Sequence, residues 1–396
     1  MIRHLLKLVW NRKRANALIV AEIFVSFIVL FAVLTGAFTF AMKWREPLGF
    51  VWQNVWDVRI ELEDERVRRD DPELRATIMR LVDEVQAMPQ VAAVGVANTP
   101  PYAFSTSQSR HDVNGREVEY VFDDVTDGYF DAMQLKLVTG RWFNASDDGA
   151  QAQPVVLDTN AAREFFQTED AVGKKFQPDE KSWCQVVGVV APFRKEGEAT
   201  GEMEMVFTRV SREPGQGRLG SHLVVRVHPG TPALFEQQLV ERLQRVAPSL
   251  TFRVRHMDQM RESMLRLKLA PLVAGIIIGS FLIAMVTLGL TGVLWQNVTR
   301  RTREIGLRRA MGATSGSVHR QVLAEVALLA TFAVVIGSVV VLQLPILGAF
   351  KYVTATAFTT GLVSALATIY GLTVLCGLYP SWLASRLQPA DALRYE

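Results

Sequence analysis

Four long apolar stretches constrain this chain more than any other feature of its sequence. They lie at residues 15–42, 268–296, 318–346 and 357–380. The hydrocarbon core of a bilayer is about 30 Å thick, so a helix needs roughly 20 mainly apolar residues to cross it. Each stretch meets that requirement. The sequence therefore predicts an integral membrane protein with four transmembrane helices.

Charge is distributed unevenly between the long loop and the rest of the chain. Residues 43–267 carry 28 Lys and Arg against 35 Asp and Glu, whereas the remainder carries 15 against 5. Short loops rich in Lys and Arg stay on the cytoplasmic side of a membrane. The basic residues 1–14 and the basic loop 297–317 therefore predict cytoplasmic N- and C-termini. The large domain and the short loop 347–356 are then expected outside.

A cleavable signal peptide is the alternative interpretation of the first stretch, because it too combines a basic start with an apolar centre. The apolar run is longer than a signal core, and no small-residue cleavage site precedes Lys43, so a span is favoured. Residues 1–14 show an amphipathic pattern, which predicts either a helix on the inner leaflet or a plain extension of the span. Cys184 and Cys376 fall in the domain and in the fourth span, so no disulfide is expected.

Residues 43–267 alternate short strands with helices, which predicts a folded α+β domain. Val58, Ile60 and Leu62 alternate with charged residues, as in a half-buried strand, and Pro72 after Asp71 is typical of a helix start. Further strand patterns occur at 91–97, 117–122, 154–157, 186–190 and 223–227, and a second helix is expected from Thr231 to about Val246.

These elements form two strand-helix-strand units at the ends of the loop. They predict a split, porter-like subdomain with a second, strand-rich subdomain inserted between about residues 125 and 215. From Met257 to Lys268 the residues Met260, Met264 and Leu267 recur at helical spacing and continue into the second stretch. This pattern predicts either a helical stalk that prolongs the second span or a packed surface helix of the domain.

The loop 297–317 has the pattern of a short helix with one apolar and one basic side. Glu304 precedes Arg308 by four residues, the favourable order for a helical ion pair, and Leu307 and Met311 share a face. Gly312 is a natural helix stop. The loop is therefore either a docking element or a basic anchor that only orients the chain.

The order of residues in this loop narrows the choice. The run from Arg303 to Ala313, REIGLRRAMGA, closely resembles the signature of the FtsX-like and MacB-like permeases of ABC systems. Residues 125–143, 154–176, 186–190 and 379–396 are also similar to segments of that family. The resemblance implies a coupling helix that seats in a groove of a cytoplasmic ATPase. Its residues would be Arg300, Arg301, Arg303, Glu304, Ile305, Gly306, Leu307, Arg308, Arg309, Met311 and Gly312.

The resemblance also implies a set of partners in the bacterial inner membrane. The phosphate-binding pattern Gly-x4-Gly-Lys-[Ser/Thr] is absent from the sequence, so ATP and Mg²⁺ are expected on a separate cytoplasmic ATPase dimer. This chain itself is expected to be non-catalytic and to bind no cofactor. A second permease, identical or related, and membrane lipid are further expected partners. A periplasmic adaptor and an outer-membrane channel would complete an efflux pump.

Mechanotransmission for efflux or export is the favoured function, and two alternatives share the topology. One is an FtsX-like regulator of periplasmic cell-wall hydrolases, whose outer domain is typically much smaller. The other is a lipoprotein-release permease. An ectoenzyme is disfavoured, because the six histidines show no metal-ligand spacing and no nucleophile elbow is present. No metal or nucleic acid is expected.

Two carboxylates, Glu22 and Glu325, fall within predicted spans. An ionisable residue inside a membrane is costly and is by default a candidate functional group. Both lie near the predicted cytoplasmic ends, where Arg14 or Arg320 could serve as a structural partner. The structural role is favoured over the functional one.

Overall fold

The computed structural model divides into two compact units, residues 43–268 and the remainder of the chain. It describes residues 13–62, 71–113, 116–179, 182–201, 203–213, 217–300, 314–348 and 353–386, together with Leu307 and Met311. The first unit is called the α/β unit below, and the second the helical unit.

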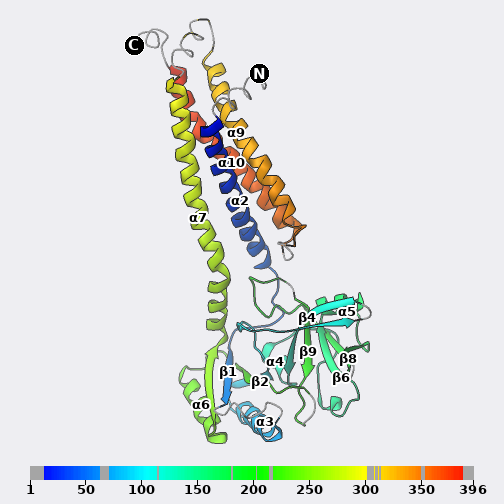
Figure 1. Cartoon of the computed structure of the whole chain (residues 1–396). Helices are drawn as coiled ribbons and strands as arrows, with labels where there is room; N and C mark the ends of the chain where they lie inside the picture. Colours follow the sequence, from blue (N-terminus) through cyan, green and yellow to red (C-terminus); the bar gives the residue numbers. More distant parts are fainter. Residues whose placement is uncertain are drawn as a thin grey trace. The chain divides into compact units, whose positions relative to one another are not determined.

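Long apolar helices make up the helical unit (Figure 1). Within the described residues, four helices are long and apolar enough to cross a membrane, which confirms the four predicted spans. Their bounds exceed the predicted ones by a few residues at most ends, and the second begins much earlier. They are α2 (Lys13–Lys43), α7 (Met257–Arg300), α9 (Ser315–Gln343) and α10 (Ala355–Arg386). The predicted amphipathic helix before residue 13 lies outside the described residues.

Helix α2 contributes the centre of the helical unit's core. Ile23, Phe27 and Phe31 are fully buried among side chains of α7, α9 and α10. Glycines on the neighbouring helices make this close approach possible, since a Cβ on Gly337 would lie 2.5 Å from Phe27 Cδ1. Gly275 of α7 has the same effect, because a Cβ at this position would lie 2.8 Å from a methyl group of Val33 in α2.

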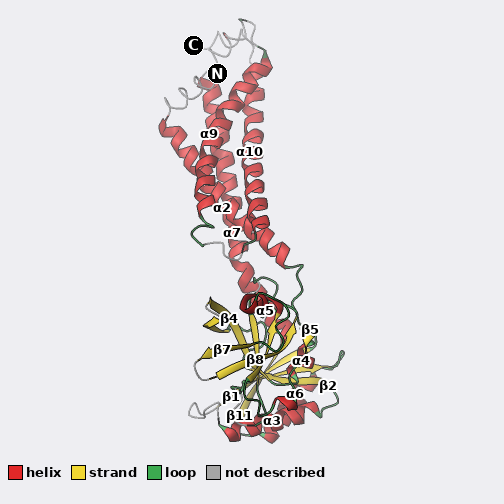
Figure 2. Ribbon diagram, turned by 90° about the vertical axis from the view of Figure 1, so that its right-hand side faces the viewer, coloured by secondary structure: helices red, strands yellow, loops and turns green. Residues whose placement is uncertain are grey.

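A mixed β-sheet forms the centre of the α/β unit (Figure 2). Its strand order is β11-β1-β10-β2-β4-β9-β6-β8-β5, with β3 paired to β4 and β7 paired to β8. The strands are β1 (Val55–Leu62), β2 (Val91–Ala97), β3 (Ser107–Val113), β4 (Arg116–Val125), β5 (Leu137–Gly140), β6 (Gln153–Asp158), β7 (Lys175–Asp179), β8 (Ser182–Val190), β9 (Met205–Arg209), β10 (His222–Val227) and β11 (Leu250–His256).

The sheet consists of two parts that meet at a single residue pair, Ala97 of β2 and Val125 of β4. One part contains β1, β2, β10 and β11 with helices α3 (Pro72–Gln86) and α6 (Leu234–Val246), so it is built from both ends of the unit. The other part contains β3 to β9 with α5 (Thr159–Phe166), whereas α4 (Tyr129–Met133) follows β4 in the sequence but packs against β2 and β10 of the first part. This is the predicted split subdomain with a strand-rich insertion.

The insertion begins earlier in the sequence than we predict. It starts before β3 and not at about residue 125, because β3 pairs with β4 and β4 pairs in parallel with β9. Alternation of side chains reveals a strand but not its partner, so sequence alone assigns β4 to the wrong part. Only the register of the sheet places residues 107–125 within the insertion.

The alternation of apolar and polar side chains along β1 determines which face of the split subdomain's sheet is apolar. Val58 and Ile60 of β1 are buried in one core with residues of α3 and α6, as the pattern predicts. Asp71 caps α3 by accepting a hydrogen bond from the amide of Glu73 at 2.9 Å. The opposite face presents Asp57 and, two residues later, Arg59. It therefore carries the polar residues of this strand.

Candidate functional site

Three segments of the α/β unit converge close to its two chain ends, Lys43 and Lys268. They are residues 44–52, residues 191–200 and the beginning of α7. Five of their residues contact one another through side chains or backbone and are called the junction cluster here: Trp44, Trp52, Arg194, Glu198 and Arg261. The sequence did not predict this cluster.

Arg194 fastens the segment after α2 to the 191–200 loop. Its side chain is only 2 % exposed. Nη1 donates to the carbonyl oxygens of Lys43 at 2.7 Å and Glu46 at 3.3 Å, and Nη2 donates to those of Glu198 at 2.9 Å and Thr200 at 2.8 Å. A guanidinium group presents five donors in a rigid fork, so it can bridge several carbonyls at once. An ammonium group could not span the same set.

Arg261 connects the beginning of α7 to the same loop. Its Nε donates to Glu198 Oε1 at 2.6 Å. Its guanidinium lies 4.8 Å from the ring centre of Trp52 and 5.4 Å from that of Trp44, within the range of cation–π attraction. Burial, followed by the charge of Glu198, raises the pKa of the neighbouring Tyr102, which therefore stays protonated.

Further contacts hold the beginning of α7 to the rest of the α/β unit. Lys268 Nζ lies 2.7 Å from Glu196 Oε2. Met257, Met260 and Met264 are buried in the core of the α/β unit, whereas Leu267 is exposed. The beginning of α7 is thus packed as a surface helix of the unit, and the same helix continues to Arg300. The segment is therefore a packed surface helix of the unit and also a helical extension of the second span, so each of the two predicted interpretations is correct in part.

A buried ion pair extends the contacts of the 191–200 loop toward the sheet. Lys195 Nζ lies 2.8 Å from Asp123 Oδ2, and both side chains are almost fully buried. The other oxygen of Asp123 accepts from the amides of Asn98 at 3.0 Å and Thr99 at 3.2 Å. The loop after β2 is therefore held, through Asp123, to the loop that carries Arg194.

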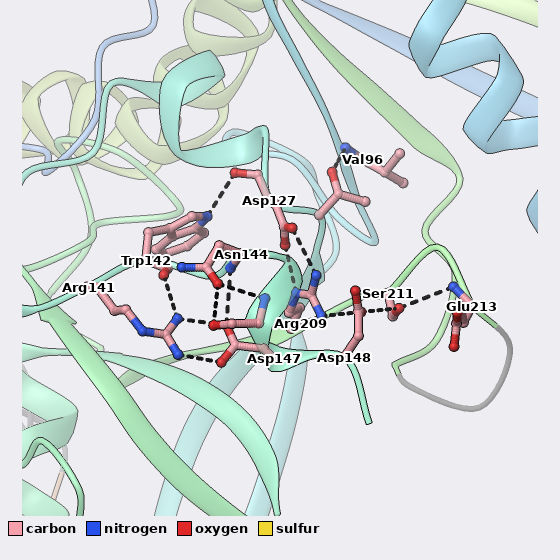
Figure 3. Close-up of polar contacts among 12 residues, drawn as sticks. Val96, Asp127, Arg141, Trp142, Asn144, Asp147, Asp148, Arg209, Ser211 and Glu213 are labelled. Carbon is pink, nitrogen blue, oxygen red and sulfur yellow. Dashed lines mark hydrogen bonds and ion pairs between the residues drawn. The ribbon is translucent and has the colours of Figure 1, made fainter. Parts of the chain in front are cut away.

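Two arginines, Arg75 and Arg209, belong to a second group of polar contacts, which connects helix α3 to the insertion. Arg209, at the end of β9, is buried and donates to Asp127 at 2.8 Å and to Asp148 at 2.6 Å (Figure 3). Hydrogen bonds from Arg209 and Ser211 hold the pKa of Asp148 below its ordinary value. Arg75 of α3 donates to the backbone carbonyl of Ser211 at 2.7 Å. Helix α3 is in this way tied to the strand of the insertion that carries Arg209.

The predicted coupling segment is described only at a few positions. Helix α7 ends at Arg300. Leu307 and Met311 are 53 % and 73 % exposed, and the amide of Met311 donates to the carbonyl of Leu307 at 3.0 Å, the spacing of an α-helix. The other predicted residues lie outside the described part of the chain: Arg301, Arg303, Glu304, Ile305, Gly306, Arg308, Arg309 and Gly312. The coupling role stays a prediction.

The two carboxylates of the spans lie in different surroundings. Glu22 packs against α7, because a Cβ on Gly289 would lie 2.8 Å from Glu22 Oε2. Glu325 is partly buried in α9. The side chain of Arg14 lies outside the described residues, and Arg320 is exposed. A functional role for either carboxylate stays a prediction.

Two other expectations concern metals and thiols. Among the described residues, no group of three His, Cys, Asp or Glu side chains is arranged to hold a metal ion. Cys184 and Cys376 are both buried, and neither belongs to a disulfide.

Membrane-spanning helices combined with a large α/β unit define a permease-type membrane subunit. Residues 17–242 match the MacB-like periplasmic core domain, and residues 276–389 match the FtsX-like permease C-terminal domain. The chain therefore belongs to the MacB-like and FtsX-like family of ABC transporter permeases, as its signature predicts. The periplasmic core domain and the four apolar helices also identify it as an inner-membrane protein.

Individual relatives agree with the family assignment. The macrolide export ATP-binding/permease protein MacB 1/2 of Paracoccus denitrificans is 28 % identical over 309 residues, which is 76 % of this chain and 45 % of the relative. The MacB protein of Chromobacterium violaceum is 30 % identical over 278 residues, 68 % of this chain and 42 % of the relative. The chain thus spans less than half the length of these relatives.

A solved structure also resembles the chain. The periplasmic region of MacB from Actinobacillus actinomycetemcomitans aligns with a TM-score of 0.40 at 16 % identity, covering 56 % of this chain and 97 % of that structure.

Proposed function

We propose that this chain is the permease subunit of an ABC-type mechanotransmission complex that serves efflux or export. A separate cytoplasmic ATPase dimer binds ATP and Mg²⁺, and its motion is passed through α2 and α7 to the α/β unit. The relatives are named for macrolide export, which supports an export role. Two permeases per complex, a periplasmic adaptor and an outer-membrane channel belong to the same proposal.

The junction cluster is the observation that carries this proposal. Arg194 binds the backbone carbonyl of Lys43, the last residue of α2, and Arg261 binds Glu198 from the beginning of α7. Both act on the same short loop through Glu198. A displacement of either helix end therefore acts on the loop through charged hydrogen bonds, which are shorter and stronger than neutral ones.

The orientation follows the positive-inside rule. Both termini and the loop 297–317 face the cytoplasm in this proposal, and the α/β unit faces the periplasm. Leu307 and Met311 then present an exposed apolar pair to the cytoplasmic ATPase. Basic residues on either side of the pair supply charge complementarity for an acidic groove.

Co-purification with the ATPase tests the coupling segment. Leu307→Ser removes half of the apolar pair, so the ATPase should be lost when the tagged chain is isolated in mild detergent. Leu347→Ser is the matched control, because Leu347 is also highly exposed but lies beyond α9. It should leave co-purification unchanged.

Two results would contradict the proposal. One is equal recovery of the ATPase with Leu307→Ser and with the unaltered chain. The other is labelling of residues 307–311 from the periplasmic side in intact cells. Either result would show that Leu307 and Met311 are not the surface to which the cytoplasmic ATPase binds.

A further inference from the structure

A pocket on the polar face of the split subdomain has no role in the mechanism above. Its volume is ≈ 470 Å³, which lies within the usual range for small-molecule sites. Strands β1, β10 and β11 supply its basic residues, and the loop between β2 and β3 supplies most of the rest. The side chains used in the argument are Arg59, Thr99, Ser105, Ser221, His222 and Arg255.

Basic and hydroxyl side chains make up most of the pocket lining, which also includes Asn98, Ala103 and Phe104, and none of its described lining residues is acidic. Arg255 and His222 both contact one carboxylate, that of Asp57, at 2.8 Å and 2.7 Å. Asp57 itself is fully buried behind them. A carboxylate only accepts hydrogen bonds, so His222 Nδ1 carries the proton and the ring is held in one orientation.

Arg59 supplies the positive charge that is left over. It projects from the same face of β1 as Asp57, two residues further along the strand, and it is exposed. Within the part of the chain that the structure describes, Arg59 forms no ion pair. Its neighbour across the strand pair, Arg253, is by contrast paired with Glu61 at 3.2 Å. One Asp57 cannot neutralise both Arg59 and Arg255.

We infer that this pocket binds the phosphate monoester group of a small polar molecule or of a lipid headgroup. Guanidinium groups match the geometry of phosphate oxygens with paired donors. The hydroxyls of Thr99, Ser105 and Ser221 can donate to the remaining phosphate oxygens and to a hydroxylated ligand body. A cation would meet unbalanced positive charge, and a wholly apolar ligand would leave the basic and hydroxyl groups of the pocket without hydrogen-bond partners.

The pocket lies next to the loop that carries the junction cluster. Its wall begins at Asn98 and Thr99, whose amides are bound by Asp123, and Asp123 is paired with Lys195. A few residues on, the amide of Tyr102 donates to the carbonyl of Lys195 at 2.9 Å. A bound phosphate therefore reduces the motion of the 191–200 loop. This second part of the inference depends on the proposed function, whereas ligand binding does not.

Calorimetric titration of the full chain in detergent tests the site. The probes are glycerol 3-phosphate and dihexanoyl phosphatidic acid, which carry the same phosphate group on a soluble body and on a lipid. Arg59→Gln should weaken binding at least about tenfold, since it removes a charge-assisted contact. Ser105→Glu should abolish binding by placing a like charge in the pocket. Arg253→Gln is the matched control and should bind normally.

The outcomes separate the sources of the phosphate from failure of the site. Binding of glycerol 3-phosphate supports a soluble ligand, and binding of the lipid alone supports a headgroup. No binding of either probe at millimolar concentration overturns the inference, as does an equal loss with Arg59→Gln and Arg253→Gln. Hydrogen exchange of residues 193–200 should slow when a probe binds. Binding without that slowing would refute the link to the junction while the pocket assignment stands.

Discussion

Replacing Arg194 with Met should release the segment after α2 from the α/β unit. The side chain keeps its length and apolar packing, but four backbone carbonyls lose their donors. A hydrogen bond to a charged group contributes about 1.5–3 kcal/mol, and such contributions are not additive within a network. We expect the local free energy of opening to fall by about 3–5 kcal/mol.

Amide hydrogen exchange, followed by mass spectrometry on the full chain, measures this opening directly. Each 1.4 kcal/mol is a factor of ten, so amides in residues 43–50 and 194–201 should exchange on the order of 100 times faster, or more. Arg194→Lys should increase the exchange rate nearly as much, because one ammonium group cannot reach all four carbonyls.

A surface arginine provides the control for this experiment. Arg212 forms a two-pronged pair with Asp83, but both side chains are largely exposed. Exposed pairs contribute about 0–1 kcal/mol, so Arg212→Met should leave exchange near Arg194 unchanged. If Arg194→Met also leaves it unchanged, Arg194 does not hold the segment and the reasoning fails.

Three further predictions concern other positions. Gly197→Ala should lower the unfolding temperature, because φ is +84° and the new Cβ would lie 2.3 Å from Tyr102; Gly230→Ala, with similar φ and open space, should cost less, and equal effects would contradict the clash. Burial raises the pKa of Asp158 to about 7, so the contribution of Asp158 to stability is fully present below about pH 4 and is lost, by at most about 4 kcal/mol, as pH rises through 7; urea unfolding at several pH values should show a smaller fall between about pH 4 and 7 in Asp158→Asn, and an unaltered slope would refute this. Gly361→Val should disturb the helical unit, since a Cβ would lie 2.2 Å from Thr35 Oγ1, and detergent-solubilised protein should unfold at lower temperature than with Gly371→Val, where space is open.

Much of the fold can be predicted from the sequence because its signals are local. Apolar length gives the spans, and Asp71 before Pro72 gives the start of α3. Alternation in β1 identifies its buried face. The REIGLRRAMGA run identifies the family. Each signal is contained within one short segment, so no knowledge of distant contacts is needed.

The junction cluster could not be predicted, because its members are far apart in sequence. Trp44, Arg194 and Arg261 come together only when the 191–200 loop folds between the two chain ends of the α/β unit. In the sequence, residues 194–198 read Arg-Lys-Glu-Gly-Glu, a pattern typical of an exposed loop. Arg194 is nevertheless buried, because the surrounding backbone carbonyls accept hydrogen bonds from both of its Nη atoms. The predicted start of the insertion was wrong for the same reason, because local sequence does not determine which strands pair.

The central claim, that the junction cluster carries ATPase-driven motion into the α/β unit, is tested most directly by a distance measurement. Spin labels at Leu234→Cys on α6 and Arg266→Cys on α7, in a chain with Cys184 and Cys376 replaced by Ala, report motion of the beginning of α7 against the sheet. Pulsed EPR on the complex with the ATPase should show a shifted distance distribution when ATP is trapped. Arg194→Met should abolish the shift while the ATPase stays bound. An identical distribution with and without ATP in the unaltered junction would contradict the account.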